Sequence, residues 1–394
     1  MKKYPTLKTT FDTNIPKPVI DEHLAYKLYV TKNKINNHKD DWNHYRSLIN
    51  DYELIGNFKI IQISKIIPIC RSYFKLWEIN QNFNIIPKDN KKISIATLCE
   101  APGSFCQAII HTRQEIFKEN KVKDNIYGIS LKKGTNKHTR WKQLPEEKEV
   151  SINRIFGDPL NQLHDGNIKN PDIVYHFINQ VKNDKCSLIT ADGGLEIALN
   201  MENYKEQLHY DLFLNEALMA LSVQKKGGNF VLKIYDIFTL ATMQLLYLLK
   251  LSYENFEITK PLTSRTTNSE KYVICSNFKD NLPKDYLDNL LEMCKKLWNY
   301  NDNEFNNITY IHSIFENNYI NSEFVNYIKK INNIYIVKQI DKINETLELI
   351  DLKKKSNLTF NEKYKELISN YRKNQISLAY TWVKLNNLPH YTKK

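Results

Sequence analysis

The feature that most constrains the fold is an alternation, from about residue 93 to residue 276, of short apolar runs with segments of helical length. The runs expected to be strands are Ile93–Leu98, Ile126–Leu131, Ser151–Phe156, Cys186–Ala191, Asn229–Ile234, Phe256–Lys260 and Lys271–Ser276. The helices expected between them lie at about 104–117, 172–183, 206–224 and 239–250. Strands joined by helical crossovers form a mostly parallel sheet with helices on both faces. Because no helix is expected between the last two strands, one edge of this α/β, doubly wound sheet should be antiparallel.

The segments on either side of this pattern look different from it. Pro5, Pro16 and Pro18 interrupt any early periodicity, so the amino-terminal segment is expected to be an irregular arm. A helix is expected at about Gln62–Ile79. After residue 280 the strand pattern stops, and apolar residues recur at helical spacing in Leu287–Trp298 and again in 322–352 and 361–385. We therefore expect an N-terminal arm (1–54), a sheet domain (55–280) and a C-terminal helical appendage (281–394).

Charge and cysteine usage limit the partners and the compartment. The formal net charge of +12 favours a polyanionic partner such as nucleic acid. AT-biased coding would produce the same richness in Lys, Asn and Ile without selection for binding, so charge alone does not decide. Since no apolar run is long enough to cross a bilayer, no membrane partner is expected. The six cysteines form no CxxC pair, which predicts reduced core residues rather than metal ligands or disulfides. An intracellular protein is expected, in cytoplasm, nucleus or virion.

A cofactor site is expected beyond the carboxyl ends of the strands, where ligands bind in open α/β sheets. The first strand leads into the segment Glu100–Phe105, in which Gly103 permits close approach of a ligand and the next helix offers free amide donors. The segment has one glycine and therefore matches neither a dinucleotide-binding fingerprint nor a P-loop. Ser130 and Asp158 end the second and third strands, and the Asp158 carboxylate can accept a hydrogen bond from an adenine amino group. A turn without a ligand, and a turn-forming role for Asp158, are the open alternatives.

Four charged residues fall where the predicted topology allows one shared site. Lys75 lies in the helix before the sheet, Asp192 follows the fourth strand, Lys233 lies in the fifth, and Glu270 precedes the last. A lysine in a buried strand is costly unless it is paired, so Lys233 is the hardest of these to explain as a surface residue. Two lysines and two carboxylates suit removal of a proton from a hydroxyl, because positive charge lowers a lysine's pKa and carboxylates orient it. For any one residue alone, a surface ion pair is the simpler interpretation.

Together these motifs resemble the FtsJ-type RNA 2′-O-methyltransferases, which carry a Lys-Asp-Lys-Glu tetrad. The similarity extends over about residues 70–277. It is carried by Lys75, Glu100–Phe105, Ala191–Gly194, Gly227–Lys233 and Ser264–Tyr272. Within the family, the stretches that look more like the mRNA cap branch than the ribosomal branch are Tyr127–Lys132, Gly227–Thr239 and Lys260–Glu270.

The resemblance implies a Rossmann-like methyltransferase sheet that binds S-adenosylmethionine and methylates the ribose 2′-hydroxyl of the first transcribed nucleotide of capped mRNA. It implies that the catalytic residues are Lys75, Asp192, Lys233 and Glu270, with Lys233 as the base. The implied cofactor-binding residues are Glu100, Ala101, Pro102, Gly103, Ser104, Phe105, Ser130, Asp158 and Asp192. The chain departs from the family pattern at Ser104, where many relatives have a second glycine, and in Gly157–Gln162, which lacks the usual Gly-Asp-rich sequence. No metal is required, because the sulfonium of this cofactor is already an activated donor.

Other functions fit the sequence less well. Methylation of a base nitrogen usually uses an Asn/Asp-Pro-Pro-aromatic turn after the fourth strand, where this chain has Ala191-Asp192-Gly193-Gly194. Methylation of ribosomal or transfer RNA ribose remains open, as does an inactive RNA-binding subunit. Capped mRNA is the expected partner, with other capping or transcription subunits as further candidates.

The helices beyond residue 280 carry apolar stripes that need a covering surface, and the sheet domain is the simplest one. Lys353-Lys354-Lys355 and Arg372-Lys373 would then face outward beside Tyr371, Tyr380 and Trp382. Basic groups next to aromatic rings can hold RNA phosphates and stack bases. The alternatives are a scaffold with solvated lysines or a docking surface for another capping subunit.

Overall fold

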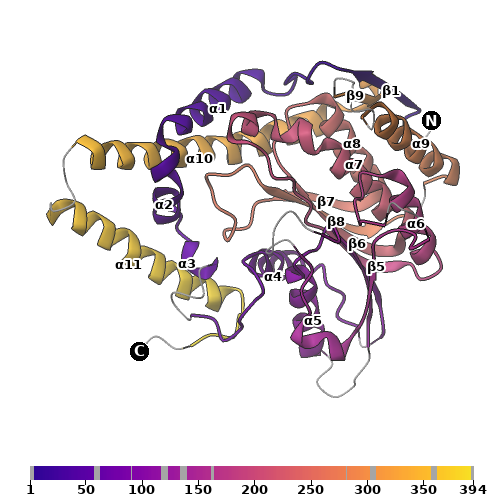
Figure 1. Ribbon diagram of the computed structural model, residues 1–394, viewed down its shortest axis with the longest axis horizontal. Coiled ribbons are helices and arrows are strands. Elements are labelled where there is room, and N and C mark those ends of the chain that lie inside the picture. Colours follow the sequence, from indigo (N-terminus) through magenta and orange to yellow (C-terminus); the bar gives the residue numbers. More distant parts are fainter. Residues whose placement is uncertain are drawn as a thin grey trace.

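The computed structural model describes residues 4–56, 63–89, 91–116, 123–133, 140–160, 164–280, 282–301, 308–355 and 362–391. Its centre is a sheet with the strand order β4-β3-β2-β5-β6-β8-β7 (Figure 1). The strands are β2 (Ser94–Leu98), β3 (Asn125–Ile129), β4 (Ser151–Ile155), β5 (Cys186–Ala191), β6 (Gln224–Ile234), β7 (Tyr253–Thr259) and β8 (Lys271–Phe278). The strands from β4 to β6 run parallel, and β8 is antiparallel to both β6 and β7. The predicted strands and the antiparallel edge are confirmed.

Helices cover both faces of the sheet because neighbouring residues of each strand point to opposite sides. Phe230 and Leu232 of β6 join a hydrophobic cluster with helices of one face, whereas Val231 joins the cluster of the other face. The helices of the first cluster are α6 (Pro171–Val181), α7 (Lys205–Val223), α8 (Leu240–Ser252) and α9 (Lys284–Asn301). Those of the second are α4 (Ser72–Phe83), α5 (Ser104–Ile116) and α11 (Glu362–Leu385). The result is the expected doubly wound, three-layer α/β arrangement.

The amino-terminal segment is ordered, and the expectation of an irregular arm was wrong. It contains β1 (Leu7–Asp12), α1 (Glu22–Lys34), α2 (Lys39–Ile49) and α3 (Glu53–Gly56). The elements that cover it come from about 300 residues later in the chain. Strand β1 pairs antiparallel with β9 (Tyr310–Phe315), and α1 and α2 share a hydrophobic cluster with α10 (Ser322–Lys355). The expectation that strands stop after residue 280 was therefore also wrong, because β9 forms by long-range pairing.

The helix expected at about 62–79 begins only at Ser72, as α4. Residues 57–62 lie outside the described part of the chain, and Ser64 instead forms a β-bridge with His390. Pro68 explains the late start, since a proline pushes the residue before it out of helical conformation. Lys75 nevertheless lies in this helix, as expected.

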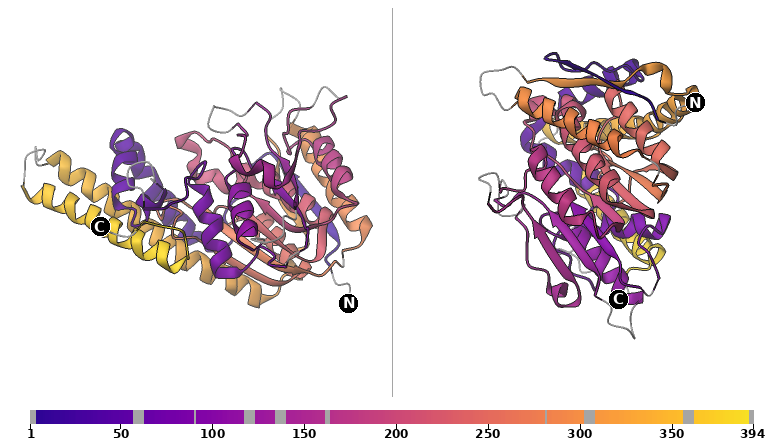
Figure 2. Two further views of the ribbon diagram at one scale, coloured as in Figure 1. Left: turned by 90° about the horizontal axis from the view of Figure 1, so that it is seen from below. Right: turned by 90° about the vertical axis from the view of Figure 1, so that its right-hand side faces the viewer.

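The three predicted C-terminal helices are present as α9, α10 and α11, and they pack on the sheet domain. Trp382 of α11 is buried, and its indole N–H donates to the Glu78 carboxylate of α4 at 3.1 Å. The ends of α10 and α11 extend beyond the sheet layers as an arm (Figure 2). Lys353 does not face solvent freely there, because its ammonium pairs with Asp41 at 2.9 Å and lies over the Tyr45 ring. Within the described residues, no helix is long and apolar enough to cross a membrane.

Candidate active site

The four charged residues singled out in the sequence come together at the edge of the sheet where the parallel strands end. Asp192 follows β5, Lys233 lies near the end of β6, Glu270 precedes β8, and Lys75 reaches the same place from α4. The Lys75 ammonium lies 2.6 Å from a Glu270 carboxylate oxygen, and the Lys233 ammonium lies 3.1 Å from an Asp192 carboxylate oxygen. All but Asp192 are at most 8% exposed. The structure thus builds two adjacent lysine–carboxylate pairs from residues spread over almost 200 positions.

The charges of the two pairs shift the pKa values of their members. Burial alone would raise the pKa of Glu270, but the ammonium groups of Lys75, Lys233 and Lys260 outweigh it and lower that pKa far below its ordinary value. Burial would likewise lower the pKa of Lys233, but Asp192, Tyr235 and Glu270 outweigh it and raise that pKa. The expectation that nearby positive charge lowers the pKa of Lys233 was therefore wrong for the protein alone. Carboxylates lie closer to this ammonium than other cations do.

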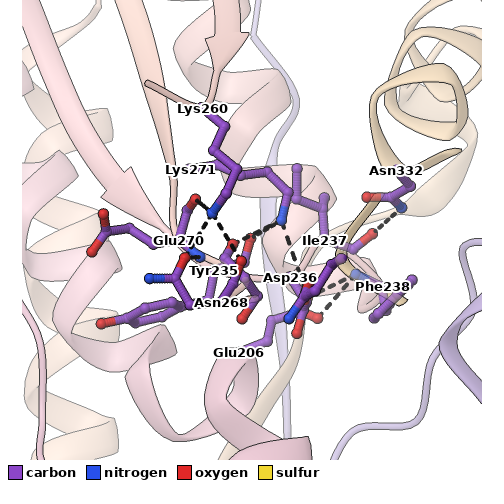
Figure 3. A network of polar contacts seen from close by, with 12 residues as sticks. Glu206, Tyr235, Asp236, Ile237, Phe238, Lys260, Asn268, Glu270, Lys271 and Asn332 are labelled. Carbon is purple, nitrogen blue, oxygen red and sulfur yellow. Dashed lines mark hydrogen bonds and ion pairs between the residues drawn. The ribbon is translucent and has the colours of Figure 1, made fainter. Parts of the chain in front are cut away.

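A lysine that the sequence analysis did not single out holds the segment before β8. The Lys260 ammonium donates to the Asn268 backbone carbonyl at 2.8 Å, to the Asn268 side-chain oxygen at 2.6 Å and to the Glu270 carbonyl at 2.7 Å (Figure 3). The Ser264 hydroxyl donates to the Glu270 carboxylate at 2.8 Å. These contacts fix the direction in which Glu270 meets Lys75. The sequence could have identified these two residues, since Lys260 and Ser264 lie in the stretch that carries the family resemblance.

A second buried network fixes the end of β6. The Lys271 ammonium donates to the carbonyls of Tyr235 and Ser269, both at 2.9 Å, and lies 3.8 Å from the Asp236 carboxylate (Figure 3). Asp236 also pairs with Lys32 of α1 at 3.1 Å. The amino-terminal helix is therefore part of the support of the Lys233 strand. Only long-range packing reveals this, because Lys32 and Asp236 are 204 positions apart.

A cavity of about 290 Å³ opens beside Lys233 at the strand ends. Four of the predicted site residues line it: Ala101, Ser130, Asp192 and Lys233. The sequence analysis missed much of the remaining lining, namely Cys99, Leu131, Gly166, Asn167, Ile168, Lys169, Gly194, Leu195, Glu196 and Leu212. Carboxylates, a hydroxyl and an ammonium beside apolar surface match the donor set that a zwitterionic nucleoside such as S-adenosylmethionine needs, so these residues fit that cofactor.

Gly166, which the sequence analysis did not single out, lies close to the backbone of a neighbouring strand end. Its φ of +78° is in the left-handed region, and a Cβ there would lie 2.0 Å from the Ser130 carbonyl oxygen. The chain after β4 is therefore pressed against the end of β3, where the Lys132 amide donates to the Asp165 carbonyl at 2.7 Å. The sequence could have predicted this turn, because Asp165-Gly166-Asn167 is a typical turn sequence.

The segment Glu100–Phe105 turns inward. The Glu100 carboxylate accepts the amides of Phe105 at 2.8 Å and Cys106 at 3.0 Å, so two of the helix donors expected to be free are occupied. Burial raises the pKa of Glu100 to about 8, and the nearby Asp192 charge adds to this. The Phe105 ring is in the core, and the Ser104 hydroxyl accepts the Cys70 amide at 3.0 Å. This segment shapes the cavity wall through Ala101.

The remaining predicted cofactor residues also have protein partners. The Pro102 carbonyl accepts the Lys142 amide at 3.1 Å. Gly103 has φ +114°, and a Cβ there would lie 3.0 Å from the Leu144 side chain rather than in open space. Asp158 is exposed, and its carboxylate accepts the Leu160 amide at 2.9 Å, which is the turn-forming contact held open as its alternative. None of these three residues lines the cavity.

Buried polar residues of α7 support the turn after Asp192. The Glu216 carboxylate accepts the Gly193 amide at 3.1 Å, and burial raises its pKa to about 8. His209 accepts the Leu195 amide at 2.8 Å, and burial lowers the pKa of this histidine to about 3, which keeps it neutral. Both residues read as ordinary helix positions in the sequence, so no local signal identified them.

The doubly wound sheet is that of a Rossmann-like methyltransferase. The chain belongs to the FtsJ-like methyltransferase family, whose model matches residues 68–278. It is 28% identical to cap-specific mRNA (nucleoside-2′-O-)-methyltransferase 2 of Drosophila melanogaster, over 59% of this chain and 33% of that protein. It is 29% identical to cap-specific mRNA (nucleoside-2′-O-)-methyltransferase 1 of Trypanosoma cruzi, over 47% of this chain and 48% of that protein. Among solved structures, a ribosomal RNA methyltransferase from Plasmodium falciparum matches with a TM-score of 0.38 and 22% identity, over 53% of this chain and 97% of that one. The chain thus spans a third to a half of the length of these curated relatives.

Proposed function

We propose that this chain transfers a methyl group from S-adenosylmethionine to the ribose 2′-hydroxyl of the first transcribed nucleotide of capped mRNA. The observation that carries the proposal is the pair of contacts Lys75–Glu270 and Lys233–Asp192 at adjacent strand ends, beside a cavity that reaches Lys233. The cap-specific relatives support the choice of substrate, since each matches this chain over about half its length or more.

The proposed chemistry assigns one task to each group. When bound, S-adenosylmethionine supplies an activated methyl group on a sulfonium. Lys233, oriented by Asp192, takes the proton of the 2′-hydroxyl. Lys75, held by Glu270, places a positive charge where the ribose oxygen becomes negative. Because the surroundings raise the pKa of Lys233, this residue is an ammonium at neutral pH, and the rate should increase with pH as it loses its proton.

The proposal is tested with labelled S-adenosylmethionine and three RNAs of matched length: capped, uncapped and structured. Nucleoside analysis of the product identifies the methylated position. We expect 2′-O-methylation of the nucleotide next to the methylated guanosine cap. Equal transfer to capped and uncapped RNA of one sequence would favour ribosomal or transfer RNA as the substrate, and binding of RNA without any transfer would favour the inactive subunit.

A further inference from the structure

Helix α4, which supplies Lys75, also carries a buried glutamate that the proposed chemistry does not use. Glu78 lies three residues after Lys75 and is 4% exposed. Side chains three residues apart on a helix are neighbours on one face, so Glu78 and Lys75 reach the same region of the protein. That region is the connection between β7 and β8, residues 260–270, which ends in Glu270 and which we call the β7–β8 segment.

The Glu78 carboxylate accepts hydrogen bonds at both oxygens. One oxygen accepts the Leu262 amide at 2.7 Å. The other accepts the Thr263 amide at 3.2 Å, the Thr263 hydroxyl at 3.0 Å and the Trp382 indole N–H at 3.1 Å. Burial raises the pKa of Glu78, and these four hydrogen bonds oppose that shift. Because all four partners are donors, the arrangement favours an ionised carboxylate at this position.

Thr263 connects this carboxylate to the Lys75–Glu270 pair. The next residue, Ser264, donates its hydroxyl to the Glu270 carboxylate at 2.8 Å. Glu270 in turn lies 2.6 Å from the Lys75 ammonium. The β7–β8 segment is therefore joined to α4 at two places, near its start through Glu78 and at its end through Lys75.

One of the four donors to Glu78 comes from the C-terminal helix. Trp382 of α11 is 1% exposed. Helix α11 lies outside residues 68–278, the part of the chain that matches the family model. A second indole, that of Trp77 in α4, donates to the Asn386 carbonyl just after α11 at 2.8 Å. Two indole hydrogen bonds thus join α4 to the end of α11, one ending on the Glu78 carboxylate and the other on a backbone carbonyl.

We infer that Glu78 is a positioning residue for methyl transfer. It holds the β7–β8 segment so that Glu270 meets Lys75, and α11 holds Glu78 through the Trp382 indole. The inference rests on the proposed function, in which the Lys75 ammonium faces the ribose oxygen. A displaced ammonium stabilises the developing charge less, and a displacement of about 1 Å can cost on the order of 10²-fold in rate. The C-terminal helix therefore contributes to the geometry of the active site.

The test compares variants that each change one hydrogen-bonding group. Glu78→Gln keeps the shape of the side chain but turns an amide N–H₂ group toward donors. Trp382→Phe removes the indole donor and keeps an aromatic ring. Trp77→Phe is the matched control, because the same substitution removes the other indole hydrogen bond between the same two helices. Thermal melting and S-adenosylhomocysteine calorimetry check that each variant folds and keeps its cofactor site.

We expect Glu78→Gln to lower the single-turnover rate of methyl transfer on the order of 10- to 100-fold, and Trp382→Phe to lower it a few fold. Affinity for RNA and for S-adenosylhomocysteine should change little, because the Lys75 ammonium acts on the reacting ribose. Trp77→Phe should keep the wild-type rate. In a Lys75→Met background, Glu78→Gln should cause almost no further loss, since it acts through Lys75.

The outcomes separate this inference from the proposed function. A wild-type rate in folded Glu78→Gln, an equal loss in Trp382→Phe and Trp77→Phe, or losses that add in the Lys75→Met background would overturn the inference while the proposed function stands. If wild-type protein methylates no RNA, the proposed function fails. The NMR resonance of the Lys75 ammonium nitrogen, assigned with Lys75→Met, then tests the hold of Glu78 on the Lys75–Glu270 pair. A shift of this resonance in Glu78→Gln but not in Trp77→Phe supports that hold, and an unchanged resonance in Glu78→Gln overturns it.

Discussion

The lysine–carboxylate tetrad and the segment Glu100–Phe105 were predicted from equally suggestive motifs, but their side chains are oriented differently in the structure. The tetrad residues converge within hydrogen-bond distance in pairs, whereas most side chains of the segment turn into the protein. Topology brings Asp192 and Lys233 together, because the carboxyl ends of parallel strands meet at one edge of a sheet. Glu270 reaches the same edge because it precedes β8, which runs antiparallel to β6. The role of the segment depends on which way each side chain turns, and local packing decides that. Strand order therefore predicts which charged residues meet better than a loop motif predicts which way its side chains point.

The largest expected effect tests the tetrad side of this comparison. Lys233→Met should lower methyl transfer to capped RNA on the order of 10²–10⁴-fold, because a positioned base is lost. S-adenosylhomocysteine affinity should change only a few fold, since the base acts on the acceptor. Single-turnover assays and calorimetry measure the two quantities, with Lys226→Met as the control. Near-normal turnover in Lys233→Met would remove the base from the proposal.

The next effect tests the cavity wall that the loop motif did not predict. Gly166→Ala places a methyl group against the Ser130 carbonyl, so the 164–169 segment must move and S-adenosylhomocysteine affinity should fall on the order of tenfold or more. Gly227→Ala is a matched control, because Gly227 has nearly the same φ, +77°, with nothing within 4 Å of its added Cβ. Both variants bear the backbone cost of a left-handed alanine, about 1–2 kcal/mol. Equal affinity in the two variants would show that this wall does not shape the ligand site.

The residues in these two predictions also show which features could be predicted from the sequence. The strands of the sheet were predictable because each is a short apolar run between turn residues, and the tetrad followed from their order. The residues that hold the tetrad in place could not be predicted in this way. Lys32 and Asp236 are distant in the chain, and Glu216 resembles any helical glutamate. The amino-terminal helices were missed for the same reason, because the face they bury is covered by α10. Gly103 shows a further limit, because the sequence does not reveal that a Cβ at this glycine would meet the Leu144 side chain.

The next prediction concerns stability and the buried carboxyl group of Glu216, which lies under the Asp192 turn. Burial raises the pKa of Glu216 to about 8 from an ordinary value near 4.5. The folded state therefore binds more protons than the unfolded state between these pH values, and this group's contribution to stability is lost as pH rises through 8. Glu216→Gln removes the titration. Relative to the variant, wild-type protein should lose on the order of 3 kcal/mol of unfolding free energy between pH 5 and pH 8.

Chemical denaturation at both pH values measures this difference, and Glu254→Gln at an exposed position of β7 is the control. A parallel pH dependence in wild type and Glu216→Gln would mean that Glu216 is ionised in the folded protein. The Asp192 turn would then be held by a charge rather than by a neutral carboxyl.

The smallest effect concerns Lys353, which the sequence suggested as an RNA contact and the structure pairs with Asp41. Both side chains are partly exposed, 36% and 25%, so solvent screens the pair and its coupling should be about 0–1 kcal/mol. A double-mutant cycle with Lys353→Ala and Asp41→Asn measures that coupling, and we expect capped-RNA affinity to stay unchanged across a salt series. The scaffold interpretation then holds for this end of α10, since a lysine that stabilises α2 is not available to phosphate. If Lys353→Ala instead binds RNA more weakly and with a flatter salt dependence, the projecting ends of α10 and α11 contact the RNA. The tetrad would then be one end of a much longer binding surface.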